Sequence, residues 1–199
     1  MRIIKIFALL SLFLLISIPV LAADETLLGS DKIDSGGYGG MEINAASIYN
    51  TPCLMVGCYG GWLINRRFMI GLGGNELVSQ VKAPDSVQTG SDTYYLNFYY
   101  GGLKFEYIDN PGKLIHFSGG VLVGVGSVNY TPMNTIDTSG RANCFVVEPD
   151  AKLLFNVNDW FRAGVGASYR FVSGVNLTGL SDNDLSGISY KMTLLFGKF

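Results

Sequence analysis

The sequence predicts an all-β protein, an up-and-down antiparallel transmembrane β-barrel of about eight strands, preceded by a cleaved signal peptide. Three observations predict this fold. The chain begins with an export signal, the remaining length is divided into segments in which large apolar residues alternate with polar or small ones, and the connections between segments alternate between short and long. No stretch with a helical period competes with these segments.

The N-terminal residues have the order of a secretory signal. Arg2 and Lys5 precede an apolar run at Ile6–Leu21, and the small residues Ala22 and Ala23 follow it. This order predicts cleavage after one of the two alanines, and an uncleaved membrane anchor is the alternative because the run is close to spanning length. No cysteine follows the run, which argues against a lipid-anchored N-terminus. The predicted segments are a signal peptide at 1–22, a short leader at 23–35 and the barrel domain at 36–199.

The rest of the chain shows the period-two alternation of half-buried strands. For example, Phe145 and Leu153 share one face of a segment whose other face carries Glu148. The fourth segment changes the phase of its apolar residues at Gly101-Gly102, which we interpret as a β-bulge or a glycine kink. The predicted strands are 37–49, 53–65, 67–80, 92–108, 113–129, 142–156, 158–173 and 185–199.

The connections between these strands differ in length in a regular order. Short links are expected at 65–66, 109–112 and 157–158, and longer polar links at 81–91, 130–141 and 174–184. Outer-membrane barrels have short periplasmic turns and longer outer loops, so the short links are placed on the periplasmic side. The first outer link, near Asn50-Thr51-Pro52, is short and is the exception.

Composition limits the classes of function. The chain is 48% hydrophobic, 13% aromatic and 15% charged, with 26 glycines and a net charge of −2. There is no basic field that would attract nucleic acid, and no cofactor motif. Cys53 and Cys58 are expected on opposite faces of one strand, and with Cys144 they form neither a disulfide framework nor a metal-binding pattern.

Alternation by itself does not separate a membrane barrel from a soluble periplasmic lipocalin-like barrel, because the two place the apolar face on opposite sides. The mixed charges and glycines of the polar face, the loop lengths and the aromatic C-terminal strand favour the membrane. Aromatic residues near strand ends are expected to form girdles at the membrane interfaces. These residues are Tyr49, Trp62, Tyr94, Tyr107 and Trp160.

An interior of about eight strands is just wide enough to be filled by side chains. The polar faces place charges of both signs there, and opposite charges are expected to pair because an unpaired buried charge is costly. We therefore predict a salt-bridged plug without an open pore. The predicted lumen charge network consists of Glu42, Lys104, Glu106, Glu148, Asp150, Lys152, Arg162, Arg170 and Lys191.

Two stretches carry a resemblance to a known class. The alternating tail Ile188–Phe199 resembles the closing strand of outer-membrane barrels, although Phe199 is out of phase with the apolar set that ends at Phe196. The stretch Trp160–Val175 resembles a signature of small OmpA/OmpX-like barrels. The resemblance implies location in the cell outer membrane, contact with its lipid and lipopolysaccharide, and insertion by the barrel-assembly machinery. It does not imply a shared activity.

His116 and Ser118 are the weak candidates for catalysis. His116-Phe117-Ser118 resembles the catalytic strand of the outer-membrane lipid A deacylases, in which a serine nucleophile works with a histidine base. That family has Asn after the Ser, where this chain has Gly119, and both side chains are expected in the lumen, away from lipid. We therefore expect no enzyme, and a histidine bonded to Glu106 or Glu148.

The outer loops are the remaining functional surface, because recognition usually resides in loops on a rigid scaffold. The leading hypothesis is a non-enzymatic outer-membrane protein that is structural or adhesive through these loops. A narrow channel for water, ions or small solutes is the alternative. The loop segments are Lys82–Ser86, Thr131–Thr135 and Leu177–Asp182, and they specify no extracellular ligand.

Overall fold

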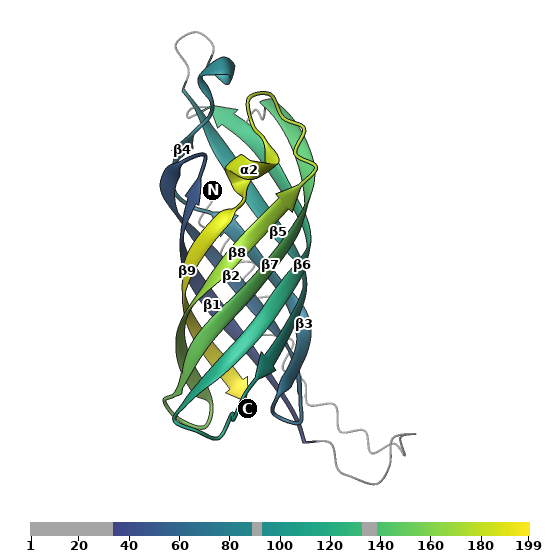
Figure 1. Cartoon of the computed structure of the whole chain (residues 1–199), viewed down its shortest axis with the longest axis vertical. Helices are drawn as coiled ribbons and strands as arrows, with labels where there is room; N and C mark the ends of the chain where they lie inside the picture. Colours follow the sequence, from purple (N-terminus) through teal and green to yellow (C-terminus); the bar gives the residue numbers. More distant parts are fainter. Residues whose placement is uncertain (1–33, 89–92, 133–138) are drawn as a thin grey trace, which may run out of the picture. The chain divides into compact units, whose positions relative to one another are not determined.

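A computed structural model describes residues 34–88, 93–132 and 139–199. The predicted signal peptide at 1–22 and almost all of the leader at 23–35 lie outside the described residues. The described chain is a meander of antiparallel strands (Figure 1). The strands are β1 (Ser35–Ile48), β2 (Thr51–Ile64), β3 (Phe68–Leu77), β4 (Val81–Lys82), β5 (Tyr94–Ile108), β6 (Ile115–Pro132), β7 (Ser139–Asn156), β8 (Phe161–Ser173) and β9 (Gly187–Lys198).

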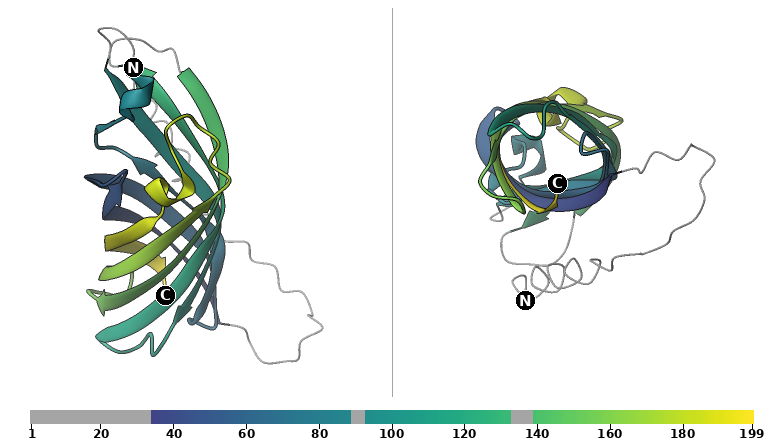
Figure 2. Two further views of the ribbon diagram at one scale, coloured as in Figure 1. Left: turned by 45° about the horizontal axis from the view of Figure 1, so that its top comes forward. Right: turned by 90° about the horizontal axis from the view of Figure 1, so that it is seen from below.

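The sheet closes on itself because β3 pairs with β5 while β9 pairs with β1. The short β4 continues the pairing of β3 along β5, so β3 and β4 act as one interrupted strand. Counted in this way, the barrel has eight strands. At the interruption, the amide of Val78 donates to the carbonyl of Leu54 at 3.1 Å, and Leu54 N donates to Ser79 Oγ at 2.7 Å. Viewed from below, the strands form a closed ring (Figure 2). The predicted all-β, up-and-down barrel is confirmed.

The connections follow the predicted alternation. The end of the barrel that holds the C-terminus has the short turns after β2, β5 and β7, and the opposite end has the longer links after β4 and β8 (Figure 1). Tyr49 and Asn50 join β1 to β2 with φ values of 49° and 53°, the left-handed geometry of a tight two-residue hairpin. The outer links contain the one-turn helices η1 (Asp85–Val87) and α2 (Asp182–Leu185). No helix of the described chain is long and apolar enough to cross a membrane.

The predicted bulge at Gly101-Gly102 is wrong. Both residues keep an unbroken register with Gly73-Gly74 on β3 and with the facing residues of β6. Even-numbered residues of β5 point into the barrel along its whole length, so Tyr100 is buried while Leu103 is exposed. The apparent change of phase arises because the inward face of β5 is apolar in its first half and charged in its second half.

The outside of the barrel is apolar. Exposed aliphatic and aromatic side chains cover every strand except the two-residue β4, and charged residues of the strands mostly point inward. Aromatic groups gather near the turns, where Phe68 packs on Tyr107 with ring centroids 5.0 Å apart and Trp160 stacks on Phe196 at 6.1 Å. Tyr94 is a correction, because it points inward and packs against the lumen core instead of joining a girdle. This outer surface excludes the lipocalin-like alternative, in which the apolar faces line the inside.

The upper rim of the barrel is uneven. The pairing of β6 with β7 extends to Ser139, past a register shift between Asn129 and Tyr130, whereas the pairing of β7 with β8 stops at Phe145. The upper ends of β5, β6 and β7 therefore rise above their neighbours, as Figure 1 shows for β6 and β7. We call this part the rim extension, defined by residues 94–99, 126–132 and 139–144.

Candidate functional site

A layer of charged side chains crosses the middle of the lumen. Its members come from four strands, and each is at most 7% exposed although each is ionisable. Period-two alternation places them inside, since every second residue of a barrel strand faces the interior. We call this set the charged layer, and it consists of Glu42 on β1, Lys104 and Glu106 on β5, Glu148, Asp150 and Lys152 on β7, and Lys191 on β9.

Lys152 is the central cation of the charged layer. Its Nζ lies 3.2 Å from Glu106 Oε2, 3.4 Å from Asp150 Oδ1 and 3.8 Å from Glu42 Oε1. It also donates a hydrogen bond of 2.7 Å to the hydroxyl of Tyr59. One ammonium group therefore holds three carboxylates, which come from three different strands, around a single point.

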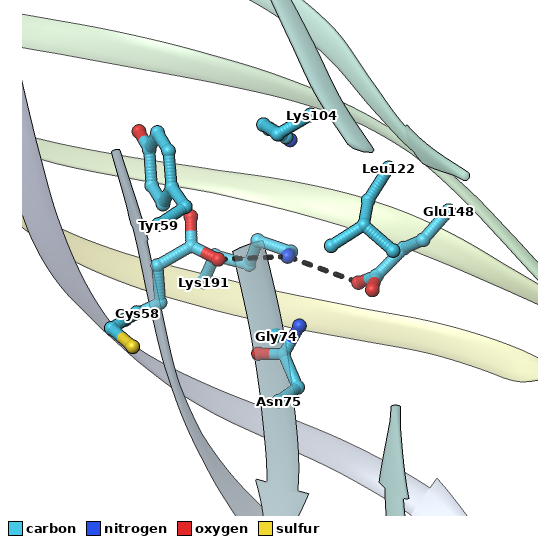
Figure 3. A pocket seen from close by; sticks show the side chains of 9 residues that line it. Cys58, Tyr59, Gly74, Asn75, Lys104, Leu122, Glu148 and Lys191 are labelled. Carbon is cyan, nitrogen blue, oxygen red and sulfur yellow. Dashed lines mark hydrogen bonds and ion pairs between the residues drawn. The ribbon is translucent and has the colours of Figure 1, made fainter. Parts of the chain in front are cut away.

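Lys191 and Lys104 complete the charged layer. Lys191 Nζ lies 3.0 Å from Glu148 Oε1 and 3.2 Å from Glu42 Oε2, so it joins two strands that are far apart around the barrel. Figure 3 shows its ammonium group directed toward Glu148. Lys104 pairs with Asp150. Four carboxylates and three ammonium groups are thus connected without interruption from β1 to β9 through the lumen.

Hydroxyl groups donate additional hydrogen bonds to the carboxylates of the layer. Glu148 accepts from Tyr100 at 2.5 Å and from Ser168 at 2.6 Å. Tyr38 donates to Glu106 at 3.0 Å, and Thr193 to Glu42 at 3.2 Å. Buried charges require such additional hydrogen bonds, because their mutual attraction alone does not offset the loss of water. A cavity of about 10 Å³, about the size of one water molecule, lies beside Glu42, Lys104, Glu148 and Lys191.

Arg162 and Arg170 correct the predicted network. Both are buried in the lumen, but neither forms an ion pair with a carboxylate in the described part of the chain. They lie near opposite ends of β8, below and above the charged layer, so their charges are too distant to join it. Each instead donates to a backbone carbonyl of a connecting loop.

Arg162 closes the end of the barrel that carries the short turns. Its Nη2 donates to the carbonyl of Pro111 at 3.3 Å, and its guanidinium carbon lies 3.9 Å from the ring centroid of Phe199. Asn156 donates to the same carbonyl at 3.0 Å and to that of Lys113 at 2.8 Å. The turn between β5 and β6 is therefore fastened by side chains from β7 and β8. The inward position of Phe199 also explains why it is out of phase with the lipid-facing residues of β9.

Arg170 closes the opposite end. Its Nε donates to the carbonyl of Leu185 in α2 at 2.7 Å, and its guanidinium carbon lies 5.5 Å from the ring centroid of Phe98. The link is also held from outside, because Asp182 Oδ1 accepts from Val175 N at 2.7 Å and Tyr49 N donates to Asp184 O at 2.8 Å. The loop that carries α2 is thus a fixed cover.

The upper lumen around Arg170 is largely apolar, which the alternation of the sequence did not predict. Leu96, Phe98 and Tyr100 of β5 are all at most 4% exposed and pack with Val128 and Val146. In the sequence, these apolar residues occupy even-numbered positions, as the inward Lys104 and Glu106 do. The predicted bulge at Gly101-Gly102 placed them on the opposite face. The lumen consists of an apolar upper part, the charged layer, and a lower apolar and aromatic cluster around Tyr38, Tyr59 and Leu63.

His116 and Ser118 lie inside the lower lumen and are at most 5% exposed. His116 Nδ1 lies 3.1 Å from the carbonyl of Lys113, so its partner is neither Glu106 nor Glu148 as expected, because the turn after β5 lies closer to the ring. Ser118 Oγ forms no hydrogen bond with the imidazole or with any other described group. Within residues 34–88, 93–132 and 139–199, no cluster of His, Cys, Asp and Glu could hold a metal ion.

The barrel closed by eight strands, its apolar outer surface and its filled lumen define the fold of a small membrane-spanning β-barrel. No protein-family model matches the chain, and no curated protein matches it. The chain is similar in fold to three solved structures. Neisserial surface protein A (NspA) has a TM-score of 0.55 at 11% identity, over 83% of this chain and 97% of the other.

The second is a major outer membrane protein from Thermus thermophilus, with a TM-score of 0.52 at 8% identity, over 82% of this chain and 99% of the other. The third is Ail, the attachment invasion locus protein of Yersinia pestis, in complex with the heparin analogue sucrose octasulfate. Its TM-score is 0.51 at 10% identity, over 84% of this chain and 99% of the other. What the chain shares with these three proteins is the fold.

Proposed function

We propose that this protein is a sealed, non-enzymatic barrel of the outer membrane that is structural or adhesive through its outer loops. The observation that carries the proposal is the charged layer, in which the ion pairs from Lys104 to Lys191 leave room for about one water. Loops held by Arg162 and Arg170 cover the lumen below and above it.

Conductance in planar bilayers tests the seal. The purified full chain is expected to give no single-channel steps, and neither Glu148→Gln nor Arg162→Gln is expected to introduce them. Steps from the unaltered chain whose size changes on Glu148→Gln would overturn the proposal. A matched control is Asp159→Asn, which removes an exposed carboxylate at the short turn after β7 and leaves the lumen untouched.

A narrow path for water or ions is the second candidate, and the cavity beside Glu148 and Lys191 is the observation that favours it. Passage would require displacement of Arg170 from Leu185 and of the apolar residues beneath it. The conductance experiment therefore separates the two candidates directly.

The described outer links after β4 and β8 support the adhesive part of the proposal because side-chain hydrogen bonds hold both of them. Ser181 and Asp184 form a capping box on α2, and Gln88 donates to the carbonyl of Ala83 at 2.9 Å. A fixed loop loses less conformational entropy when it binds a partner. Cells that carry the chain with Asn176→Ala and Thr178→Ala, both exposed in the link after β8, are expected to bind host-cell surfaces less than cells with Asn110→Ala, in a periplasmic turn. Equal binding would favour a purely structural role.

The lipid A deacylase hypothesis receives no support from the geometry around Ser118. A serine nucleophile needs a hydrogen-bonded base and access to the substrate, and Ser118 Oγ is buried in the lumen without a partner. We therefore propose that Ser118→Ala leaves the lipid A profile of the cell unchanged. A lost modification in that variant would contradict the non-enzymatic assignment.

A further inference from the structure

A cavity of about 320 Å³ lies at the outer end of the barrel, between the rim extension and the two described outer links. We call it the outer cavity. Its walls come from Tyr94 and Tyr130 of the rim extension, from residues 86–87 in η1, and from residues 177–178 in the link after β8. It shares no lining residue with the small cavity of the charged layer. Its volume is at the lower end of the range for small-molecule sites, which is roughly 300–1,000 Å³.

The two links beside the outer cavity are fixed to the barrel. Tyr130 Oη donates to the carbonyl of Thr178 at 2.8 Å, which holds the link after β8 beside the upper end of β6 (Figure 1). Gln88 donates to the carbonyl of Ala83 at 2.9 Å and accepts from Tyr94 N at 3.0 Å, which holds η1 against β5. A preformed cavity of this kind loses little conformational entropy when a ligand enters it.

Gly179 brings the two links into contact with each other. Its φ is 76°, and a Cβ at this position would lie 2.9 Å from Pro84 Cβ. Glycine is the residue that combines this left-handed backbone with so close an approach. The contact at Gly179 therefore sets the distance between the walls that carry Ser86 and Thr178.

The lining of the outer cavity carries no charge. The described residues around it are aromatic, aliphatic, hydroxylated or glycine. Val87, Tyr94 and Leu177 also pack against the apolar core of the upper lumen. A charged ligand would lose water here without gaining an ion pair, which is costly. The outer cavity therefore favours an uncharged ligand.

Three hydroxyl groups distinguish the outer cavity from a purely apolar one. They belong to Ser86, Tyr94 and Thr178. The hydrogen bonds that Tyr94 and Thr178 form with described residues use their backbone groups, so both hydroxyls are available to a ligand. A hydroxyl group both donates and accepts, and another hydroxyl is a matching partner for it. An acyl chain would leave all three groups without a partner.

The ring of Tyr94 supplies a flat, half-buried surface beside these hydroxyls. Among the described residues it packs on no other aromatic ring. A sugar ring has a face of C–H groups and an edge of hydroxyl groups. It is therefore complementary to an aromatic ring that is bordered by hydroxyl groups.

From this combination we infer that the outer cavity binds an uncharged sugar unit, with its C–H face on Tyr94 and its hydroxyls bonded to Ser86 and Thr178. The inference rests on the adhesive part of the proposed function, because it names the chemical class that the outer links recognise. The uncharged lining excludes sulfated and carboxylated sugars from the same cavity.

Saturation-transfer difference NMR on the full chain in phosphatidylcholine nanodiscs tests the inference. Nanodiscs replace detergent, whose sugar or acyl groups could occupy the cavity. The probes are the methyl glycosides of glucose, galactose, mannose and N-acetylglucosamine, with glucose 6-sulfate as the charged comparison. At least one glycoside is expected to show saturation transfer to its ring protons, and the sulfated sugar is expected to show none.

Substitutions at the cavity separate the contributions of the ring and the hydroxyl. Tyr94→Phe keeps the ring and is expected to weaken binding by about threefold to tenfold, since one hydrogen bond is lost. Tyr94→Leu also removes the ring and is expected to weaken binding by more than about tenfold. Gly179→Ala is expected to abolish binding and to keep the heat-modifiable band, because it separates the links and leaves the strands unchanged. The matched control is Tyr107→Phe, in an exposed tyrosine near the opposite end, which should leave the affinity unchanged.

Absence of saturation transfer from all four glycosides would overturn the inference. Equal affinity of Tyr94→Leu and the unaltered chain, with the same heat-modifiable band, would overturn it as well, and so would tighter binding of glucose 6-sulfate. Attachment of cells to host surfaces, measured on the same variants, separates the inference from the adhesive proposal. Glycoside binding that Tyr94→Leu removes, with unchanged attachment, would support the sugar site and contradict its adhesive role. Attachment without any glycoside binding would overturn the inference and leave the adhesive proposal standing.

Discussion

Replacement of Lys152 by methionine tests the central claim about the lumen. Lys152 is 1% exposed, and its ammonium group is within 3.8 Å of Glu42, Glu106 and Asp150. Methionine has a similar length and no charge, so the substitution removes the cation without leaving a large cavity. Glu106 then has no ion-pair partner in the described chain, whereas Asp150 keeps Lys104 and Glu42 keeps Lys191.

The expected cost follows from the burial of those carboxylates. Removal of one partner of a buried ion pair costs about 3–5 kcal/mol, because it leaves an uncompensated charge. Since Glu106 loses its ion-pair partner, we expect a cost within this range, which raises the unfolding constant by between about a hundredfold and several thousandfold. The matched control is Lys113→Met, an exposed lysine in the turn after β5, which should change the free energy of unfolding by less than about 0.5 kcal/mol.

Urea unfolding of the full chain in lipid vesicles measures the free energy. The unheated band on a gel reports the folded fraction, and the fluorescence of Trp62 and Trp160, both exposed on the outer surface, gives a second reading. A cost below about 1 kcal/mol for Lys152→Met would refute the reasoning, since it would mean that the network is hydrated. Addition of Glu106→Gln to Lys152→Met should recover more than about 1 kcal/mol, because the two groups are coupled.

Three further predictions address the orientation, the wall and the lower closure of the barrel. Leu103→Arg, on the outer surface, should lower the free energy of unfolding in vesicles by about 2–4 kcal/mol. Leu114→Arg, in a water-exposed turn, should lower it by less than about 1 kcal/mol. Similar costs for the two variants would contradict a lipid-facing wall. Gly61→Ala should abolish the heat-modifiable band, because the new Cβ would lie 2.6 Å from Gly71 Cα. Gly112→Ala, whose Cβ would meet no atom, should leave the band intact. A normal band from Gly61→Ala would contradict the close packing of the two strands. Arg162→Met should destabilise the barrel by about 1–3 kcal/mol and speed hydrogen exchange in the turn after β5, and unchanged exchange would show that the turn is held by other contacts.

The sequence was sufficient for the strands and for the faces of most of them. Alternation has a period of two, so one polar run identifies the inward parity of a whole strand, as Glu148, Asp150 and Lys152 do for β7. The same argument placed Cys53 and Cys58 on opposite faces of β2, and in the structure Cys53 is buried while Cys58 is exposed. Short turns and long loops then oriented the barrel in the membrane.

Height within the barrel was not available from the sequence. The odd or even position of a residue in its strand shows whether its side chain points into or out of the barrel. The height of that side chain along the barrel axis depends on the register between strands, because neighbouring strands are tilted and staggered. Arg162 and Arg170 share the parity of the charged layer and lie below and above it. The inward Leu96, Phe98 and Tyr100 were missed for a related reason, because both faces of that half of β5 carry large apolar or aromatic residues and the contrast disappears.

The groups that fill the lumen are arranged in three zones along the barrel axis. Charged groups lie in the middle, where the tyrosines and Thr193 supply hydrogen bonds, and apolar clusters lie on both sides. The apolar clusters keep water from the ion pairs, which strengthens their attraction because the local dielectric is low. The ion pairs in turn join β1, β5, β7 and β9 across the lumen, so opening a path through the layer would require these ion pairs to separate. The same contacts that hold the charged layer together also fill the middle of the lumen.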